Sequence, residues 1–120
     1  MVVSIAAGVT TRKIESNLFP QVRVIRVMPN TPALIGEGMS GMVGGSSATQ
    51  EDIEYVKSLL LNIGKCVVVE KEDDLDIVTA ISGSGPAFFY KIINDFARAG
   101  EKLGLDYEKS LLLIKRMLLQ

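Results

Sequence analysis

The sequence predicts an α/β fold in which a layered sheet is followed by a helical region. Up to residue 70, β-branched apolar runs and short amphipathic segments follow one another in the order β-α-β-β-α-β. Such an order is typical of a sheet covered by helices. From Asp73 onward the strand signals stop and two apolar helical patterns follow. We therefore place a domain boundary in the acidic stretch 70–76, assigning residues 1–72 to the sheet and 73–120 to the helices.

Composition narrows the possible functions. The chain has 120 residues, is 48% hydrophobic and carries a net charge of −1, with no histidine and one cysteine. This composition excludes histidine-based metal sites and an internal disulfide, and it lacks the basic surface expected of a nucleic-acid binder. The apolar content indicates a subunit partner, and the apolar segment 1–10 is too short to span a membrane. We expect a cytoplasmic protein that binds neither nucleic acid nor membrane.

The first half of the sheet follows from three segments. Residues 2–6 are apolar and predict a strand, and a short helix begins near Thr10 or Thr11, either of which can cap it. Residues 22–29 are rich in valine and isoleucine, which predicts a second strand. The stretch 28–38 holds two prolines and is predicted as a loop.

The second half of the sheet begins with the glycine-rich stretch 38–45, a strand candidate. Ser47 and Gln50 have the spacing of a capping box, and an apolar face at helical spacing runs on from there. Gly64 is suited to follow the end of that helix, and residues 65–70 predict the last strand.

Two helices are predicted in the C-terminal part. Pro86 is suited to the first turn of a helix whose apolar face ends before Gly104. Asp106 can cap a second helix, predicted to run to Gln120. Because this second helix is apolar on almost every side, it needs more neighbours than the chain itself offers, which indicates association.

The motif "SGSGPA" at 82–87 is the first candidate site. Gly83 and Gly85 carry no side chain, Ser82 and Ser84 offer hydroxyls, and a helix start with free N–H groups follows. These features favour close approach of a small anionic substrate or cofactor. The alternative is a tight helix entry against neighbouring backbone.

Two further motifs lie at predicted strand ends. In "MPNTPA" (28–33), Asn30 and Thr31 could bond a carboxamide or a sugar hydroxyl at the edge of the sheet where α/β proteins bind ligands, or could simply form a turn. In "SIAAGV" (4–9), the small residues would let a flat ring approach the backbone, although ordinary turn chemistry explains them equally well. The acidic run 70–76 is a solvated face or a metal site, and no second ligand cluster supports a metal.

Taken together and in this order, these motifs resemble pyrroline-5-carboxylate reductase. The resemblance covers about residues 2–110 and rests on "SIAAGVT", "VIRVMPNTPA", "GEGMSG", Glu72 with Asp76, Val78 and Thr79, "SGSGPAFFY", and the "GLD" that opens the last helix. It implies the C-terminal part of a Rossmann-like sheet that binds NAD(P)H, followed by the start of an all-α dimerisation domain. The implied reaction is hydride transfer from NADPH or NADH to the C=N carbon of 1-pyrroline-5-carboxylate, giving proline.

The resemblance also implies site residues. Those expected near the nicotinamide cofactor are Ile5, Ala6, Ala7, Asn30 and Thr31, and those expected to bind substrate are Glu72, Ser82, Gly83, Ser84 and Gly85. The Glu72 carboxylate would favour the protonated, more electrophilic imine. No catalytic residue and no metal ligand is assigned, and the implied assembly is a homodimer or higher homo-oligomer.

The chain departs from the family pattern at both ends. The family's opening strand with its glycine-rich dinucleotide fingerprint and its "PGGTT"-type loop are absent from residues 1–120, and the last helix reads "IKRMLLQ" where the family tends to place small residues. We therefore expect a partial reductase, inactive by itself, and nothing in the chain distinguishes NADH from NADPH. Two alternatives stay open: a non-catalytic association module, and a related oxidoreductase that acts on another imine or carbonyl.

Overall fold

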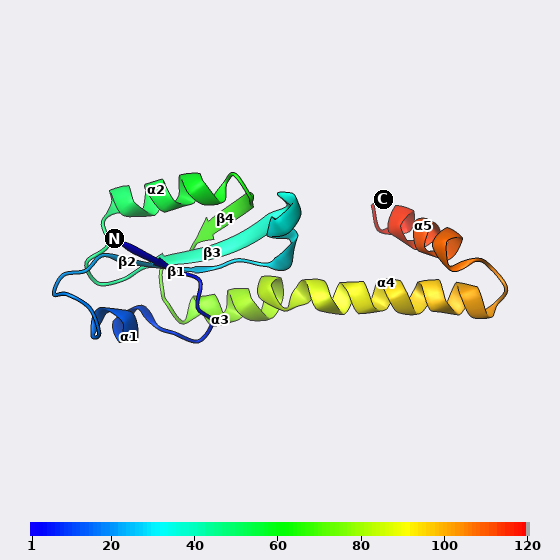
Figure 1. The fold of residues 1–120 in the computed structure, drawn as a ribbon, viewed down its shortest axis with the longest axis horizontal. Coiled ribbons are helices and arrows are strands. Elements are labelled where there is room, and N and C mark those ends of the chain that lie inside the picture. The colour runs from blue at the N-terminus through cyan, green and yellow to red at the C-terminus, as the bar shows by residue number, and fades with distance from the viewer. Residues whose placement is uncertain (120) are drawn as a thin grey trace. The chain divides into compact units, whose positions relative to one another are not determined.

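The computed structural model describes residues 1–119, which group into two compact units, one from Met1 to Ser84 and one from Gly85 onward. The first unit contains β1 (Val2–Ser4), α1 (Thr11–Glu15), β2 (Val24–Met28), the 3-10 helix η1 (Thr31–Ile35), β3 (Gly38–Gly44), α2 (Gln50–Leu60), β4 (Gly64–Val68), α3 (Asp74–Val78) and the π-helical turn η2 (Thr79–Gly83). The second unit contains α4 (Gly85–Lys102) and α5 (Tyr107–Leu118) (Figure 1). The predicted α/β class and its β-α-β-β-α-β order are confirmed.

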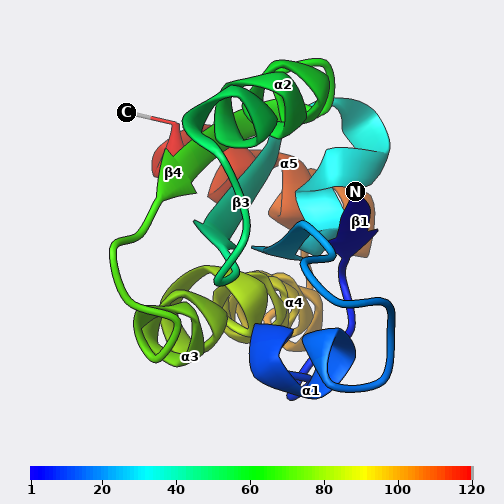
Figure 2. The ribbon, with the colours of Figure 1, turned by 90° about the vertical axis from the view of Figure 1, so that its left-hand side faces the viewer.

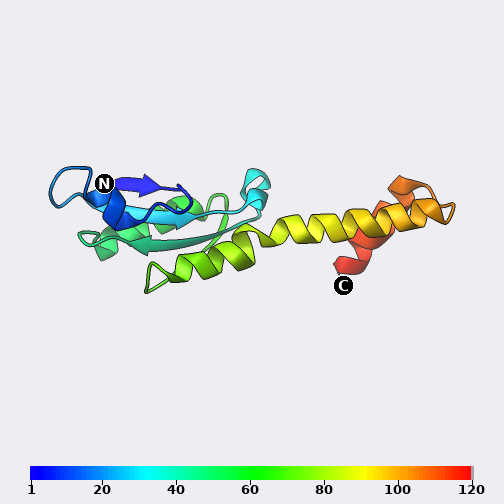
Figure 3. The ribbon, with the colours of Figure 1, turned by 90° about the horizontal axis from the view of Figure 1, so that it is seen from below.

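The four strands form one mixed sheet in the order β1-β2-β3-β4. β1 pairs with β2 in parallel and β2 pairs with β3 antiparallel (Figure 3). β3 pairs with β4 in parallel. The ends of β1 and β2 therefore lie at the same edge of the sheet as the beginnings of β3 and β4. This edge brings together loops that are far apart in the sequence.

Helix α2 covers one face of the sheet, and α1 and α3 lie on the other (Figure 2). The core under α2 is built from Ile25, Val27, Met42 and Val56, which are all at most 1% exposed. On the opposite face, Gly41 of β3 allows α3 to approach closely. A Cβ at that position would lie 2.8 Å from Val78 Cγ1 and 3.0 Å from Leu75 Cδ2, so a larger residue there would push α3 outward.

The start of α2 differs from the prediction. The predicted capping box used Ser47 and Gln50, whereas the structure forms one from Thr49 and Asp52. The Thr49 hydroxyl accepts a hydrogen bond from the Asp52 N–H at 3.2 Å, and the Asp52 carboxylate accepts one from the Thr49 N–H at 3.0 Å. Both pairs have the same three-residue spacing, and a carboxylate is the stronger acceptor for the free N–H groups of a helix start.

The other end of α2 also differs. The helix ends at Leu60 with Leu61 as its C-cap, and Gly64 is not the residue that follows it. Instead Gly64 opens β4 with φ +144°, opposite Gly38. A Cβ on Gly64 would collide with the Gly38 backbone, so this glycine is required by strand pairing rather than by helix termination.

Helical structure begins earlier than predicted, since α3 and η2 precede the helix expected at Pro86. The first compact unit includes α3 and η2 and ends at Ser84. The boundary placed after residue 72 stays a prediction about domain organisation.

The second unit is a helical hairpin. Asp106 caps α5, because its side chain accepts a hydrogen bond from the Lys109 N–H at 3.2 Å, as predicted. Gly100 of α4 packs against Ser110 of α5, and a Cβ on Gly100 would overlap the Ser110 side chain. The predicted end of the last helix at Gln120 lies outside the described residues. Among residues 1–119, no helix has the length and apolarity needed to cross a membrane.

Candidate functional site

A groove with a volume of about 480 Å³ lies in the first unit, at the edge where β1 and β2 end. Its lining residues are Ile5, Pro29, Asn30, Thr31, Ala33, Leu34, Leu60, Ile63 and Gly83. They come from the segment after β1, the β2–η1 connection, η1, the end of α2, the α2–β4 connection and the end of η2. Four of them, Ile5, Asn30, Thr31 and Gly83, were predicted as site residues from separate motifs, and the fold brings them together.

Asn30 connects three segments at the groove. Its side-chain Nδ2 donates to the carbonyl oxygen and to the hydroxyl of Ser82, each at 3.2 Å. Its Oδ1 accepts a hydrogen bond from the Met39 N–H at 2.8 Å. The amide thus links the β2–η1 connection to the start of β3 and to the "SGSG" turn.

The turn Ser82–Ser84 ends η2. The Ser84 N–H donates to the Thr79 carbonyl at 2.8 Å, which closes the π-helical turn. Gly83 faces the groove, and a Cβ there would lie 3.2 Å from Met28 Cε. Gly85 is the first residue of the second unit. Its role in substrate binding stays a prediction.

Ala6 and Ala7 are exposed and follow β1, but they are not among the residues that line the groove. The Ala6 N–H donates to the Ser4 hydroxyl at 3.3 Å, which ends the strand. Only Ile5 of this segment reaches the groove, where it is 67% exposed.

The apolar wall of the groove was missed at the sequence level. Leu34, Leu60 and Ile63 line it, and Leu34 is 90% exposed. Leu60 and Ile63 belong to the apolar face predicted for α2, which indicates a core position and carries no sign of a ligand. Only the strand order, which places the end of α2 beside the end of β2, identifies them.

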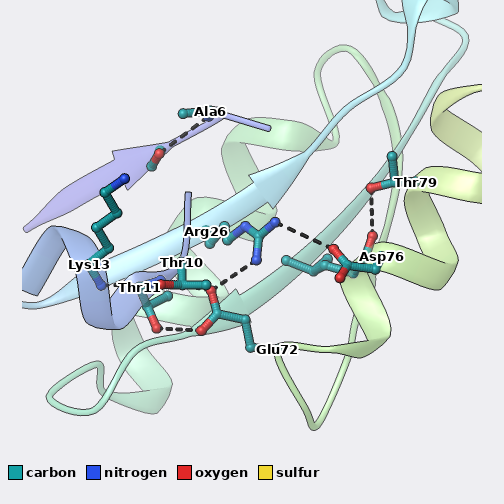
Figure 4. A network of polar contacts seen from close by, with 10 residues as sticks. Ala6, Thr10, Thr11, Lys13, Arg26, Glu72, Asp76 and Thr79 are labelled. Atoms are coloured by element: carbon teal, nitrogen blue, oxygen red, sulfur yellow. Dashed lines mark hydrogen bonds and ion pairs between the residues drawn. The ribbon is translucent and has the colours of Figure 1, made fainter. Parts of the chain in front are cut away.

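Glu72 occupies a polar network away from the groove lining (Figure 4). Its carboxylate accepts hydrogen bonds from the Thr11 N–H at 2.7 Å, from the Thr11 hydroxyl at 2.8 Å and from Arg26 Nη1 at 3.0 Å. Arg26 Nη2 also lies 3.8 Å from Asp76 Oδ1. The Arg26 side chain is only 5% exposed, so Glu72 neutralises a buried charge.

The network determines the protonation state of Glu72. Partial burial disfavours the charged carboxylate, but the hydrogen bonds from Thr11 and the nearby Arg26 charge outweigh burial, and the pKa of Glu72 lies below its ordinary value. At neutral pH Glu72 is therefore an anion with most of its acceptor capacity used inside the protein.

The groove itself is suited to a flat, largely apolar ligand group. Its walls are aliphatic side chains and the bare backbone of Gly83, with Asn30 and Thr31 as its polar members. A nicotinamide ring fits such a surface. The phosphates of a dinucleotide have no counterpart in it, because no lysine or arginine lines the groove. The G-x-G-x-x-G pattern at 36–41 leads from η1 into β3, whereas the dinucleotide fingerprint connects a strand to the start of a helix. Within residues 1–119 no group of three or more Cys, Asp or Glu side chains is arranged to hold a metal ion.

The structure thus defines a class of protein: an α/β sheet with a groove at the edge where β1 and β2 end, followed in the chain by a helical hairpin. Comparison with known proteins makes the relationship specific: residues 72–119 match the family model for pyrroline-5-carboxylate reductase dimerisation.

Two curated relatives are similar over most of the chain. A pyrroline-5-carboxylate reductase of Pasteurella multocida is 39% identical over 97% of this chain and 42% of its own length. One of Pseudomonas aeruginosa is 41% identical over 90% of this chain and 40% of its own length.

Solved structures agree. The crystal structure of a Plasmodium falciparum pyrroline carboxylate reductase with NADP bound matches with a TM-score of 0.90 and 36% identity, over 97% of this chain and 46% of that one. A Streptococcus pyogenes 1-pyrroline-5-carboxylate reductase matches with a TM-score of 0.92 and 30% identity, over 98% of this chain and 45% of that one. The resemblance predicted from the motifs is confirmed: this chain is similar to pyrroline-5-carboxylate reductases and spans less than half of their length.

Proposed function

We propose that this chain forms part of a pyrroline-5-carboxylate reductase and contributes the nicotinamide side of its active site. The observation that carries the proposal is the groove, in which Ile5, Asn30, Thr31 and Gly83 meet although their motifs are far apart in the sequence. The cofactor is NADP or NAD, and the substrate is 1-pyrroline-5-carboxylate. The similarity to an NADP-bound reductase supports this assignment.

The chain's own residues orient the reactants. When bound, the cofactor supplies the hydride that reduces the C=N bond of the substrate. The aliphatic wall of Leu34, Leu60 and Ile63 would hold the flat ring and exclude water from one of its faces. Ile5, in the segment after β1, and Thr31, at the start of η1, would also contact the ring, with Ala6 and Ala7 beside Ile5.

The substrate is proposed to lie against Ser82, Gly83, Ser84 and Gly85, where the two glycines carry no side chain and so allow close approach to the backbone. Glu72 is proposed to favour the protonated imine. Its ionised state supports that role, because an anion stabilises a nearby cation. The hydrogen bonds from Thr11 and Arg26 leave it few acceptor positions for a direct contact, so it would act mainly through its charge.

The partner is proposed to be a second copy of the protein, in a homodimer or a higher homo-oligomer located in the cytoplasm. Apolar side chains of the helical unit support this, with Phe96, Leu112, Leu113 and Met117 each more than half exposed. Large apolar side chains that gather on one exposed surface mark protein–protein interaction sites. The match of residues 72–119 to a dimerisation model supports the same conclusion.

The proposal is tested by completing the protein. The chain would be joined to the segments of the Pasteurella multocida relative that lie on either side of the matched region, and NADPH and NADH oxidation would be followed with 1-pyrroline-5-carboxylate. We expect activity in the completed protein and none in the 120-residue chain alone.

A matched pair of variants tests the groove in the completed protein. Leu34 lines the groove and is 90% exposed, whereas its neighbour Ile35 is 79% exposed and is not among the lining residues. Leu34→Asp should raise the KM for NADPH at least tenfold, because it places a charge against an apolar ring, and Ile35→Asp should leave it unchanged. If the two substitutions raised the KM for NADPH equally, the groove would not be the cofactor-binding site.

A second candidate function is a non-catalytic association module, which the exposed apolar side chains of α4 and α5 favour. A completed protein that is folded and oligomeric but inactive with 1-pyrroline-5-carboxylate would support it. Activity with another cyclic imine alone would instead indicate a related oxidoreductase.

A further inference from the structure

We propose that Asn30 is a positioning residue, whose side-chain amide holds the Ser82–Ser84 turn in place as one wall of the groove instead of donating a hydrogen bond to a ligand. The proposal rests on the proposed function only for the identity of the molecule in the groove. The positioning itself is a property of this chain and can be measured without a ligand.

The hydrogen-bonding capacity of Asn30 is almost fully used inside the protein. A side-chain amide has two N–H donors and one oxygen with two lone pairs. Nδ2 faces two acceptors of Ser82, its carbonyl and its hydroxyl, and Oδ1 accepts from the Met39 N–H. A ligand carbonyl could receive a hydrogen bond from Asn30 only if a contact to Ser82 were given up.

The contacts of Asn30 tie the β2–η1 connection both to the start of β3 and to the Ser82–Ser84 turn. Asn30 follows β2, Met39 lies at the start of β3, and Ser82 is separated from Asn30 by 52 positions in the sequence. Gly83, next to Ser82, lines the same groove as Asn30. Without the amide, the Ser82 carbonyl loses its donor and the position of Gly83 is no longer tied to the β2–η1 connection.

Thr31 provides the contrast. It lines the same groove and is exposed, and among residues 1–119 its hydroxyl takes part in no hydrogen bond. Its hydroxyl is therefore available to a ligand, whereas the Asn30 donors are not. Two adjacent polar residues of one motif thus have different roles, one structural and one facing the ligand.

The test uses the ¹⁵N-labelled 120-residue chain and NMR measurement of amide signals and hydrogen exchange. In Asn30→Ala the Met39 amide should exchange roughly tenfold faster, as expected for the loss of one hydrogen bond, and the Ser82, Gly83 and Ser84 signals should shift. Asn30→Asp keeps an acceptor for Met39 but has no N–H donor, so Met39 should stay protected while the turn still shifts. Thr31→Val should change neither.

Titration of the completed protein with NADPH then separates positioning from direct contact. Asn30→Ala should weaken the NADPH-induced shift at Gly83 and disturb the turn before NADPH is added. If Asn30→Ala weakened the response to NADPH while the free chain kept its Met39 exchange rate and its Ser82–Ser84 signals, Asn30 would be a ligand contact and the proposal would be wrong. If wild type did not respond to NADPH but the substitutions moved the turn as expected, the proposed function would fail and the positioning role would stand.

A milder variant covers the case in which Asn30→Ala does not fold. Ser82→Ala removes only the hydroxyl acceptor and leaves the Ser82 carbonyl contact with Asn30. It should shift the turn signals by a smaller amount and leave Met39 exchange unchanged. Unchanged turn signals in both Ser82→Ala and Asn30→Asp would overturn the proposal.

Discussion

Replacing Glu72 by alanine should destabilise the first unit strongly, because the substitution leaves a buried arginine without its closest partner. Arg26 is 5% exposed and Glu72 Oε1 lies 3.0 Å from its Nη1. Removing one member of a buried ion pair costs about 3–5 kcal/mol. Asp76 Oδ1, 3.8 Å from Arg26 Nη2, and the 24% exposure of the Glu72 side chain both soften the loss, so we expect the lower end, about 3 kcal/mol.

The same substitution also releases the start of α1. Glu72 accepts hydrogen bonds from the N–H and the hydroxyl of Thr11, the first residue of that helix. Because α1 has only five residues, it depends on such tertiary contacts more than a long helix would. We expect weakened protection of the α1 amides together with the global destabilisation.

The assay is urea unfolding of the 120-residue chain, followed by circular dichroism. A loss of about 3 kcal/mol at a slope of about 1.5 kcal/mol/M lowers the midpoint by about 2 M. The matched control is Glu70→Ala, since Glu70 is exposed, belongs to the same acidic stretch and takes part in no hydrogen bond or ion pair among residues 1–119. A midpoint for Glu72→Ala within about 0.3 M of the control would refute this account of the network.

Three other predictions follow from particular contacts. Hydrogen bonds from Thr11 and the charge of Arg26 lower the pKa of Glu72, so the stabilisation that Glu72 provides is complete above its unfolded pKa and is lost as pH falls through the lower folded pKa. The difference in unfolding free energy between wild type and Glu72→Gln should therefore shrink below about pH 4. A constant difference down to about pH 2 would contradict this. Thr49→Ala should cost about 1 kcal/mol in urea unfolding and Ser47→Ala almost nothing, and the reverse order would restore the predicted cap. Gly100→Ala should lower the thermal midpoint of the helical unit, at a cost of about 1–3 kcal/mol, because the added Cβ overlaps Ser110. Ser110→Ala should not lower that midpoint, because it removes a buried hydroxyl that has no hydrogen-bond partner among residues 1–119.

The strand and helix order could be predicted from the sequence because each element carries a strong local signal. The β-branched run before Pro29 forms β2, and Asp106 caps α5 as expected. The signals were weaker where two candidates shared one spacing, as at Ser47 and Thr49, and the choice depended on which side chain could accept from the free helix N–H groups. The short α3 and η2 were missed because an acidic run followed by serine and glycine has little helical preference of its own. Packing of Leu75 and Val78 against Gly41 stabilises them instead.

Some residues that line the groove could be predicted from sequence motifs, and others could not. Ile5, Asn30, Thr31 and Gly83 sit in motifs with small or polar residues, which stand out at predicted strand ends. Leu34, Leu60 and Ile63 look like ordinary apolar positions in the sequence. They become part of a site because β2 and β3 are antiparallel and β3 and β4 are parallel, which places the end of β2 and the starts of β3 and β4 at the same edge. Strand direction is a tertiary property that local patterns do not encode.

Polar residues in motifs have two possible roles, and counting their hydrogen bonds distinguishes them. Asn30 and Glu72 were both assigned to ligands because of their motif positions, and both have most of their hydrogen-bonding capacity satisfied within the first unit. A group whose partners are all protein atoms contributes to a site through geometry or charge, since a new contact must replace an existing one. Thr31 has no such partner among residues 1–119, so it is the polar residue of this groove whose hydroxyl is available for direct recognition.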